Sequence, residues 1–481
     1  MAVSVKKPAG GKSHEPFDPE AFRDSIATVD QTGKRRWIYP KEPSGRLYFW
    51  RQVVAYVCIA LLFIAPFIKV NGQPMFLFNI IERKFIIFGM TFWPQDFHLF
   101  VLSMIAFFVF IVLFTVIFGR IWCGWTCPQT VFMEMVFRRI EYWIEGDNVA
   151  QRKLSQAPWN TEKILKRTSK YILFAAISFL IGNLVMAYMI GVDELLNVVL
   201  ASPLENWGRF TFVMVFSGIF YLVFAYLREQ ACIAICPYGR LQGVLLSKDS
   251  LVVSYDHVRG EPRGKLSKDP AADTSAKGDC IDCKLCVAVC PTGIDIRNGT
   301  QLECVNCAAC IDACDSIMDR IDKPRGLVRV ASYNSIAAGI PFRITPRIIA
   351  YSAVLLGLIV VLGFSLGGRS DVETTLLRTP GVLFQQMEDG YISNLYNLQI
   401  VNKTQHEYPV TLKLVSPEGR IRMVGKDLVV PSQDIAKGAC FIEIPRAALD
   451  DRKTEVKIEI WSGDQRIDQV STNFLGPGGR R

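Results

Sequence analysis

The sequence predicts a polytopic α-helical membrane protein with a soluble domain in its last long loop and an antiparallel β-sandwich at its C-terminal end. Three observations predict this fold class. Five long stretches lack charged side chains, eight cysteines form two closely spaced groups of four, and the C-terminal part alternates apolar with polar residues. Half of the 481 residues are hydrophobic, which is unusual for a water-soluble protein.

Each of the five apolar stretches is long enough to cross a bilayer as a transmembrane helix. They divide the chain into an N-terminal tail over 1–46, four helices over 47–237, a loop over 238–346, a fifth helix over 347–368 and a C-terminal domain over 371–481. The first four helices are predicted at about 52–68, 97–119, 171–192 and 210–227.

Positive charges near the helix ends predict the orientation. Lys and Arg concentrate before the first helix and between the second and third, whereas the link from Asp193 to Trp207 has none. The positive-inside rule then places the N-terminus and the 238–346 loop in the cytoplasm of a bacterium. The C-terminal domain is expected in the periplasm, beyond the inner membrane. We therefore read the formal charge of +9 as a marker of topology, and we expect the lipid bilayer and no nucleic acid as a partner.

The densest cysteine motif is CIDCKLCVAVCPTG, from Cys280 to Gly293, and it recurs as CVNCAACIDAC from Cys304 to Cys314. Three cysteines of such a motif bind one iron-sulfur cubane and the fourth binds the neighbouring one. Two [4Fe-4S] clusters are therefore predicted, on Cys280, Cys283, Cys286 and Cys314 (cluster 1) and on Cys304, Cys307, Cys310 and Cys290 (cluster 2). Zinc is the alternative, but two identical four-cysteine spacings fit it poorly. The stretch from about 270 to 320 resembles a two-cluster bacterial ferredoxin domain.

A second pair of motifs, CGWTCPQ and CIAICPY, follows the second and fourth predicted helices. Residues four apart share one face of a helix, so two adjacent helix ends would present four thiols, those of Cys123, Cys127, Cys232 and Cys236. The proline after each second cysteine disfavours continuation of the helix, and nearby arginines are expected to favour thiolate. Thiolates select Cu(I), zinc or iron-sulfur centres over hard cations, and for a copper ion a sulfur-rich site would favour one-electron reduction. Free thiols beside helix-ending prolines are the alternative.

Other cofactors have less support. The chain has four histidines, of which only His98 lies at a predicted helix, so a bis-histidine haem site within the bilayer is excluded. No Gly-rich dinucleotide fingerprint is recognisable, so neither NAD nor FAD is expected. Cys58 and Cys440 have no patterned partner and are expected to be buried or incidental thiols.

Two further segments have predicted structures. VFMEMVFRRIEYWIEG, residues 131–146, has apolar groups at helical spacing and is expected to lie along the inner leaflet or to form a core helix. Beyond the fifth helix, runs such as YNLQIVNKT and TEVKIEIWS predict a sandwich of immunoglobulin type without a disulfide. This domain either contacts a partner or caps the helices.

With the segments KRRWIYPKEPSGRLYFWRQ and FGMTFWPQDF, these motifs resemble the cytochrome c oxidase accessory protein family of CcoG, FixG and RdxA over nearly the whole chain. The resemblance implies assembly of a cbb3-type oxidase by a cupric reductase. Cys123, Cys127, Cys232 and Cys236 would then handle copper, and the eight ferredoxin-like cysteines would bind the clusters. The cysteine motifs alone are also similar to NapH and NosR type membrane electron-transfer proteins.

The leading hypothesis is therefore a membrane iron-sulfur oxidoreductase that converts Cu(II) to Cu(I). Its expected partners are a cytoplasmic electron donor, copper ions, and oxidase subunits or copper chaperones and transporters, with homo-oligomerisation left open. A quinol-linked relay of NapH type and a non-catalytic assembly scaffold or copper-binding protein are the alternatives.

Overall fold

The computed structural model describes Thr28 and residues 34–70, 72–265, 277–381, 383–404, 406–425, 428–449 and 451–477. Most of the predicted N-terminal tail, the start of the predicted ferredoxin-like domain and the last four residues lie outside the described residues. The chain forms two compact units. The first comprises 1–65 and 103–359, and the second comprises 66–102 and 360–481.

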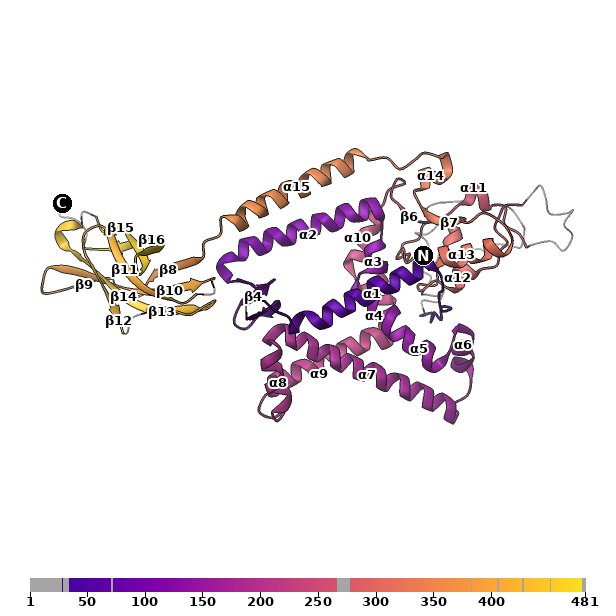
Figure 1. Cartoon of the computed structure of the whole chain (residues 1–481), viewed down its shortest axis with the longest axis horizontal. Coiled ribbons are helices and arrows are strands. Elements are labelled where there is room, and N and C mark those ends of the chain that lie inside the picture. The colour runs from indigo at the N-terminus through magenta and orange to yellow at the C-terminus, as the bar shows by residue number, and fades with distance from the viewer. Residues whose placement is uncertain are drawn as a thin grey trace, which may run out of the picture. The chain divides into compact units, whose positions relative to one another are not determined.

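The five predicted membrane helices are present among the described residues (Figure 1). They are α1 (Arg46–Ile64), α2 (Phe97–Phe118), α7 (Thr161–Ile190), α9 (Trp207–Leu222) and α15 (Pro346–Gly367). Short helical turns extend three of them, so that the apolar spans run from Arg46 to Phe67, Pro94 to Phe118 and Trp207 to Leu227. Each span is long and apolar enough to cross a membrane.

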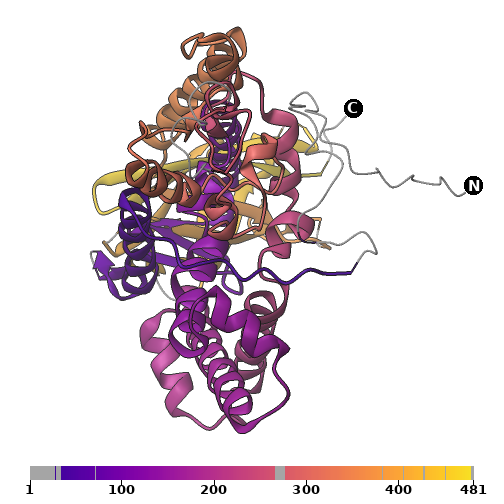
Figure 2. The same cartoon turned by 90° about the vertical axis from the view of Figure 1, so that its right-hand side faces the viewer.

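Within the first unit, α7 packs against α9 and against α5 (Arg138–Glu145) (Figures 1 and 2). Phe137, from the π-helical turn η4 (Met133–Phe137), lies at the centre of this packing and is fully buried. Its ring centroid is 4.7 Å from those of both Phe174 and Phe224. Val131, Phe132, Met133 and Met135 are also buried, so this part of residues 131–146 forms a core element, as the second reading of the sequence pattern proposes, whereas Trp143 is exposed.

Shorter helices connect these elements. They are α3 (Ile121–Trp125), α4 (Pro128–Phe132), α6 (Asn148–Gln156), α8 (Val192–Leu200), the π-helical turns η5 (Val223–Leu227) and η6 (Ala231–Ile235), and α10 (Pro237–Leu245).

The cysteine-rich domain is built on an antiparallel pair of strands, β6 (Val252–Tyr255) and β7 (Val328–Ala331), and on two helices, α12 (Leu285–Ala288) and α13 (Ala309–Arg320). The helices α11 (His257–Gly260) and α14 (Tyr333–Ala338) flank the strands. Asp312 of α13 accepts hydrogen bonds from the backbone N–H groups of Leu47 and Tyr48, at 3.2 and 2.8 Å. A carboxylate of the domain therefore stabilises the first turn of α1, as anions do at helix N-termini.

The second unit contains two antiparallel sheets that enclose a common apolar core. One has the order β12-β14-β10-β8, with β9 also on β10, and the other has the order β13-β11-β15-β16. The strands are β8 (Val372–Arg378), β9 (Gln385–Gln386), β10 (Tyr391–Asn402), β11 (Tyr408–Ser416), β12 (Arg420–Val424), β13 (Leu428–Val430), β14 (Ile435–Pro445), β15 (Lys453–Ser462) and β16 (Gln465–Leu475). The predicted β-sandwich is confirmed, and Cys440 is a buried free thiol of its core.

Small strands of the 66–102 segment complete the second unit. They are β1 (Lys69–Val70), β2 (Gln73–Pro74), β3 (Phe76–Asn79), β4 (Lys84–Ile87) and β5 (Met90–Phe92). Buried Asp96 follows them and forms ion pairs with Arg369 and Lys403, at 2.7 and 2.8 Å. The segment before α2 is thereby tied to the β-sandwich.

Candidate metal centres

Two separate cavities in the cysteine-rich domain are each lined by four cysteines of one predicted cluster. Cys280, Cys283, Cys286 and Cys314 line the first, together with Tyr255, Met318 and Leu327. Cys290, Cys304, Cys307 and Cys310 line the second, with Cys286 and apolar groups such as Val253 and Ile296. Lys284 and Arg297 also line the first cavity, and Thr292 lines the second. Four thiols in largely apolar surroundings are the donor set that an iron-sulfur cubane requires, so the residues fit [4Fe-4S] clusters.

The backbone explains how each motif directs its cysteines into a cavity. Asp282 and Lys284 have left-handed conformations, with φ of 52° and 57°. Asn306 and Ala308, at the equivalent positions of the second motif, have φ of 51° and 64°. The two loops therefore bend at the same points, which places three closely spaced cysteines around one cavity.

The buried thiols have raised pKa values. Burial raises the pKa of Cys286, Cys304 and Cys314 each to about 12. A thiolate ligand at these positions needs a compensating positive charge, which a bound metal cluster supplies.

The paired CxxxCP motifs do not lie on continuous α-helices. Cys123 belongs to α3, whereas Cys127 has extended backbone and precedes Pro128, the first residue of α4. Cys232 belongs to the π-helical turn η6, and extended Cys236 precedes Pro237, the first residue of α10. Each proline thus ends one helical segment and begins another, because its ring fits the first helical position.

The two motifs nevertheless lie side by side. The amide Nε2 of buried Gln242, on α10, donates a hydrogen bond to Cys123 Sγ at 3.4 Å. Gly239 approaches the Cys232 carbonyl so closely that an added Cβ would lie 2.3 Å from its oxygen and 3.2 Å from Arg120 Nη2. Among the described residues, no three Cys, His, Asp or Glu side chains already converge at metal-binding distance.

The expectation that nearby arginines favour thiolate is wrong for Cys127 and Cys232. Burial raises the pKa of Cys127, and burial together with the neighbouring thiols raises the pKa of Cys232 to about 12, although Arg120 opposes this. Arg138 and Arg228 are instead paired with carboxylates. These thiols therefore stay protonated until a cation displaces the proton.

The first CxxxCP motif rests directly on the loop that carries the cluster 2 cysteines. Cys123 and Cys307 belong to one buried apolar group. An added Cβ on Gly124 would lie 2.3 Å from the Val305 carbonyl oxygen and 3.1 Å from the Cys307 backbone. Trp125 Nε1 also donates to the Asn306 carbonyl at 3.3 Å. The absence of a side chain at Gly124 permits this approach.

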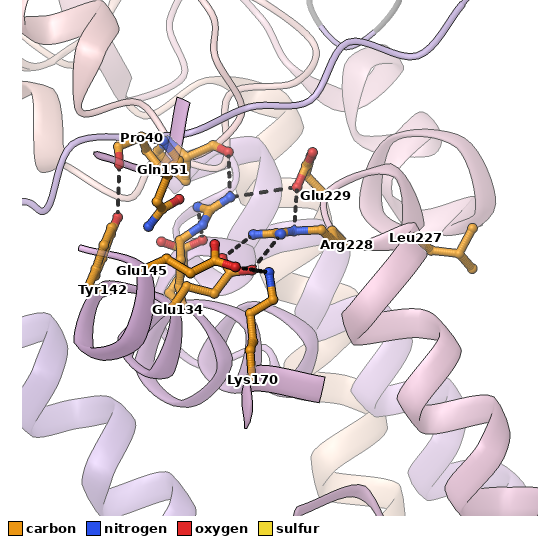
Figure 3. A network of polar contacts seen from close by, with 12 residues as sticks. Pro40, Glu134, Tyr142, Glu145, Gln151, Lys170, Leu227, Arg228 and Glu229 are labelled. Atoms are coloured by element: carbon orange, nitrogen blue, oxygen red, sulfur yellow. Dashed lines mark hydrogen bonds and ion pairs between the residues drawn. The ribbon is translucent and has the colours of Figure 1, made fainter. Parts of the chain in front are cut away.

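A buried ionic network lies beside these motifs, and sequence reasoning missed it (Figure 3). Arg228 forms a bidentate pair with Glu141, at 2.8 and 2.6 Å, and Lys170 binds Glu145 at 2.8 Å. Arg138 pairs with Glu134 and Glu229 and donates to the Pro291 carbonyl at 3.3 Å. The only sequence signal was the four-residue spacing of Glu134 and Arg138 on one helical face. The network links the helices to the residue that follows Cys290.

Comparisons with known proteins agree with this organisation. Residues 100–153 match the family described as 4Fe-4S binding domain, and residues 227–333 match the 4Fe-4S dicluster domain. Residues 362–477 match the immunoglobulin-like fold at the C-terminus of FixG. The chain is 30% identical to Nitrogen fixation protein FixG of Rhizobium meliloti, over 93% of this chain and 94% of that protein. The chain belongs to the FixG family.

Two further relatives extend the FixG family comparison. Protein RdxA of Cereibacter sphaeroides is 35% identical over 76% of this chain and 79% of its own length. Protein RdxB of the same organism is 34% identical over 77% of this chain and 80% of its own length. This FixG-family chain is thus a multi-pass membrane iron-sulfur protein with an immunoglobulin-like C-terminal domain.

Proposed function

We propose that this FixG-family chain is a membrane cupric reductase, which transfers one electron to Cu(II) at Cys123, Cys127, Cys232 and Cys236 and yields Cu(I) for assembly of a cbb3-type oxidase. One observation carries the proposal, the contact of Cys123 and Gly124 with the loop of Val305 and Cys307. It brings the paired motifs next to the cysteines assigned to cluster 2. The bound clusters would supply one-electron exchange.

The residues of the paired motifs suit copper reduction. Thiols bind Cu(I) more tightly than Cu(II), so a sulfur site favours uptake of the electron by the ion. Cys232 lies in a buried environment that raises its pKa, so copper binding would release a proton. Gln242 holds Cys123 Sγ in place. The sulfurs must still move together, because no three are preassembled among the described residues.

The proposal includes a direction across the membrane. The N-terminal segment and the cysteine-rich domain would be cytoplasmic, and a cytoplasmic reductant would supply the electron. The C-terminal domain would be periplasmic and available to oxidase subunits or to copper chaperones and transporters.

The proposed redox step is balanced: one Cu(II) ion accepts one electron from the cytoplasmic reductant and becomes Cu(I).

The test uses the full chain with intact clusters in detergent, purified without oxygen. Wild type and a variant with Cys123, Cys127, Cys232 and Cys236 changed to Ser are reduced, and Cu(I) formation is followed with a Cu(I) chelator. We expect at least about a tenfold loss of rate in the variant. Cys58→Ser, a lone thiol in α1, is the control and should retain the rate.

Equal rates in wild type and the four-Ser variant would refute the site. Cluster reduction by quinol without copper, lost in the four-Ser variant, would instead establish the quinol-linked relay. Oxidase assembly that survives removal of the cluster cysteines would establish the scaffold.

A further inference from the structure

The structure assigns a second binding site to the first unit, a basic cavity for a small, anionic, aromatic electron carrier such as reduced flavin mononucleotide. The inference rests on the proposed function, because the carrier would supply the electrons that reduce copper. The cavity measures about 430 Å³. This lies within the range of roughly 300–1,000 Å³ that small-molecule sites occupy.

Three sequence segments form the cavity. The N-terminal stretch Arg36 to Pro40 forms one wall, and Arg152 of α6 contributes from a second side. The cysteine-rich domain contributes Lys284, Val287, Ala288, Cys290 and Gly293. The N-terminal stretch is held in place by a hydrogen bond from Lys41 N to the Ala288 carbonyl, at 2.7 Å.

The charge of the cavity favours an anion. Arg36, Arg152 and Lys284 are exposed cations on three different segments. None of them forms an ion pair with a carboxylate in the part of the chain that the structure describes. Three converging cations without such partners attract a phosphate group.

The aromatic and apolar groups favour a planar ring beside that phosphate. Trp37 and Tyr39 line the cavity together with Ile38, Val287 and Ala288. The guanidinium of Arg35 lies 4.1 Å from the Trp37 ring centroid and fixes its orientation. Aromatic surface next to positive charge is suited to a ring that carries a phosphate tail.

The position of the cavity indicates electron transfer. Cys290, a predicted cluster 2 ligand, forms part of its wall. Lys284 stands between the cluster 1 cysteines Cys283 and Cys286. Flavin hydroquinone releases electrons singly, as a cubane accepts them. Two oxidised clusters would take up two electrons from one hydroquinone, which becomes oxidised flavin and releases two protons.

The binding test uses the full chain in nanodiscs of zwitterionic lipid and oxidised flavin mononucleotide, whose fluorescence reports binding without any electron transfer. The variant is Arg36→Ala, Arg152→Ala and Lys284→Asn, in which Asn suits the left-handed backbone of Lys284. Its control removes three exposed cations outside the cavity, Lys153, Arg320 and Arg343, by change to Ala. We expect about tenfold weaker binding in the cavity variant and little change in the control.

A single substitution, Arg152→Glu, avoids any change near the cluster loops and should also weaken flavin binding.

The electron-transfer experiment compares photoreduced flavin mononucleotide with the reduced methyl viologen cation. The cavity variant should lose about tenfold in cluster reduction by the flavin but not by the viologen.

Several outcomes would overturn the site. One is that wild type shows no saturable flavin binding, and another is that the cavity variant binds flavin as tightly as wild type does. A third is that glycerol phosphate displaces the flavin at equal concentration, which would indicate a site for phosphate alone. Flavin binding that persists while the wild type fails to reduce Cu(II) would refute the proposed function and leave the cavity assignment intact. Copper reduction with viologen but without flavin binding would refute the cavity assignment and leave the proposed function intact.

Discussion

The side chain of Gln242 donates a hydrogen bond to the sulfur of Cys123, at 3.4 Å. The two residues are 119 positions apart, and Gln242 lies on the helix that begins directly after Cys236. The contact therefore joins the two CxxxCP motifs, whose proximity could only be assumed from the sequence.

Removal of this hydrogen bond should affect the copper site and leave the clusters unchanged. Gln242→Leu keeps a similar volume but deletes the donor, so Cys123 is held less well. We expect several-fold slower copper reduction, because one net hydrogen bond contributes about 1 kcal/mol. The neighbouring exposed residue provides the control, Leu241→Ala. Unchanged copper kinetics in Gln242→Leu would show that the bond has no positioning role.

Gly124→Ala should separate the first motif from the cluster 2 loop. The new Cβ would lie 2.3 Å from the Val305 carbonyl oxygen, so one of the two backbones must shift. We expect a lower melting temperature and an altered electron paramagnetic resonance signal of cluster 2. The matched control is Gly218→Ala in α9, where nothing lies within 4 Å and the helix gains about 1 kcal/mol of propensity. A wild-type spectrum in Gly124→Ala would contradict the close approach.

The buried pair of Arg228 and Glu141 should be essential for the stability of the first unit. Arg228→Met removes the bidentate partner and leaves Glu141 buried. Breaking such a pair from one side costs about 3–5 kcal/mol, which should appear as a large drop in melting temperature. Arg209→Met, which breaks an exposed pair with Glu194, is the control and should change the temperature little. Similar behaviour of both variants would contradict the prediction.

Acidification should weaken the first unit through Glu141. Burial alone would raise the pKa of this carboxyl, but Arg228 and Lys170 outweigh burial and hold the pKa below its usual 4.5. A lowered folded-state pKa gives stability that is complete above the unfolded pKa and is lost as pH falls through the folded value. Melting temperatures from about pH 7 to about pH 3 should therefore fall less steeply in Glu141→Gln than in wild type. Parallel curves would show that Glu141 is not a source of the dependence.

The ion pairs of Asp96 should hold the 66–102 segment to the β-sandwich. Asp96→Asn leaves Arg369 and Lys403 without their shared carboxylate, in surroundings that bury Lys403 almost completely. We expect faster protease cleavage within 66–92 at unchanged β-sheet content. Asp389→Asn, at an exposed pair with Arg420, should leave the cleavage rate as in wild type. Equal protection of Asp96→Asn and wild type would refute the link.

Sequence patterns predicted the features that depend on local composition. The apolar stretches located the five long helices found in the described part of the chain, and the cysteine spacing matched the two cavities. The helix starts were less accurate, because α1 begins at Arg46 and α7 at Thr161, within charged segments that a hydropathy criterion omits.

Long-range contacts account for what the sequence could not predict. Arginines near the CxxxCP motifs suggested thiolates, but burial raises the pKa of Cys127 and Cys232. In addition, Glu134 and Glu229 pair with Arg138, and Glu141 pairs with Arg228. The cavity between Arg36, Arg152 and Lys284 combines residues from three distant segments, and only the segment of Lys284 belongs to a cysteine motif, whose pattern predicts cluster ligands and no cavity beside them.

The cap that Asp312 places on α1 has a consequence for the order of synthesis. The N–H groups of Leu47 and Tyr48 emerge from the ribosome long before Asp312 exists, so this cap can form only after the chain has been translated as far as Asp312. Asp312 lies between Cys310 and Cys314. We therefore expect the first turn of α1 to gain this pair of hydrogen bonds only when the segment that carries the second cysteine motif has folded against it.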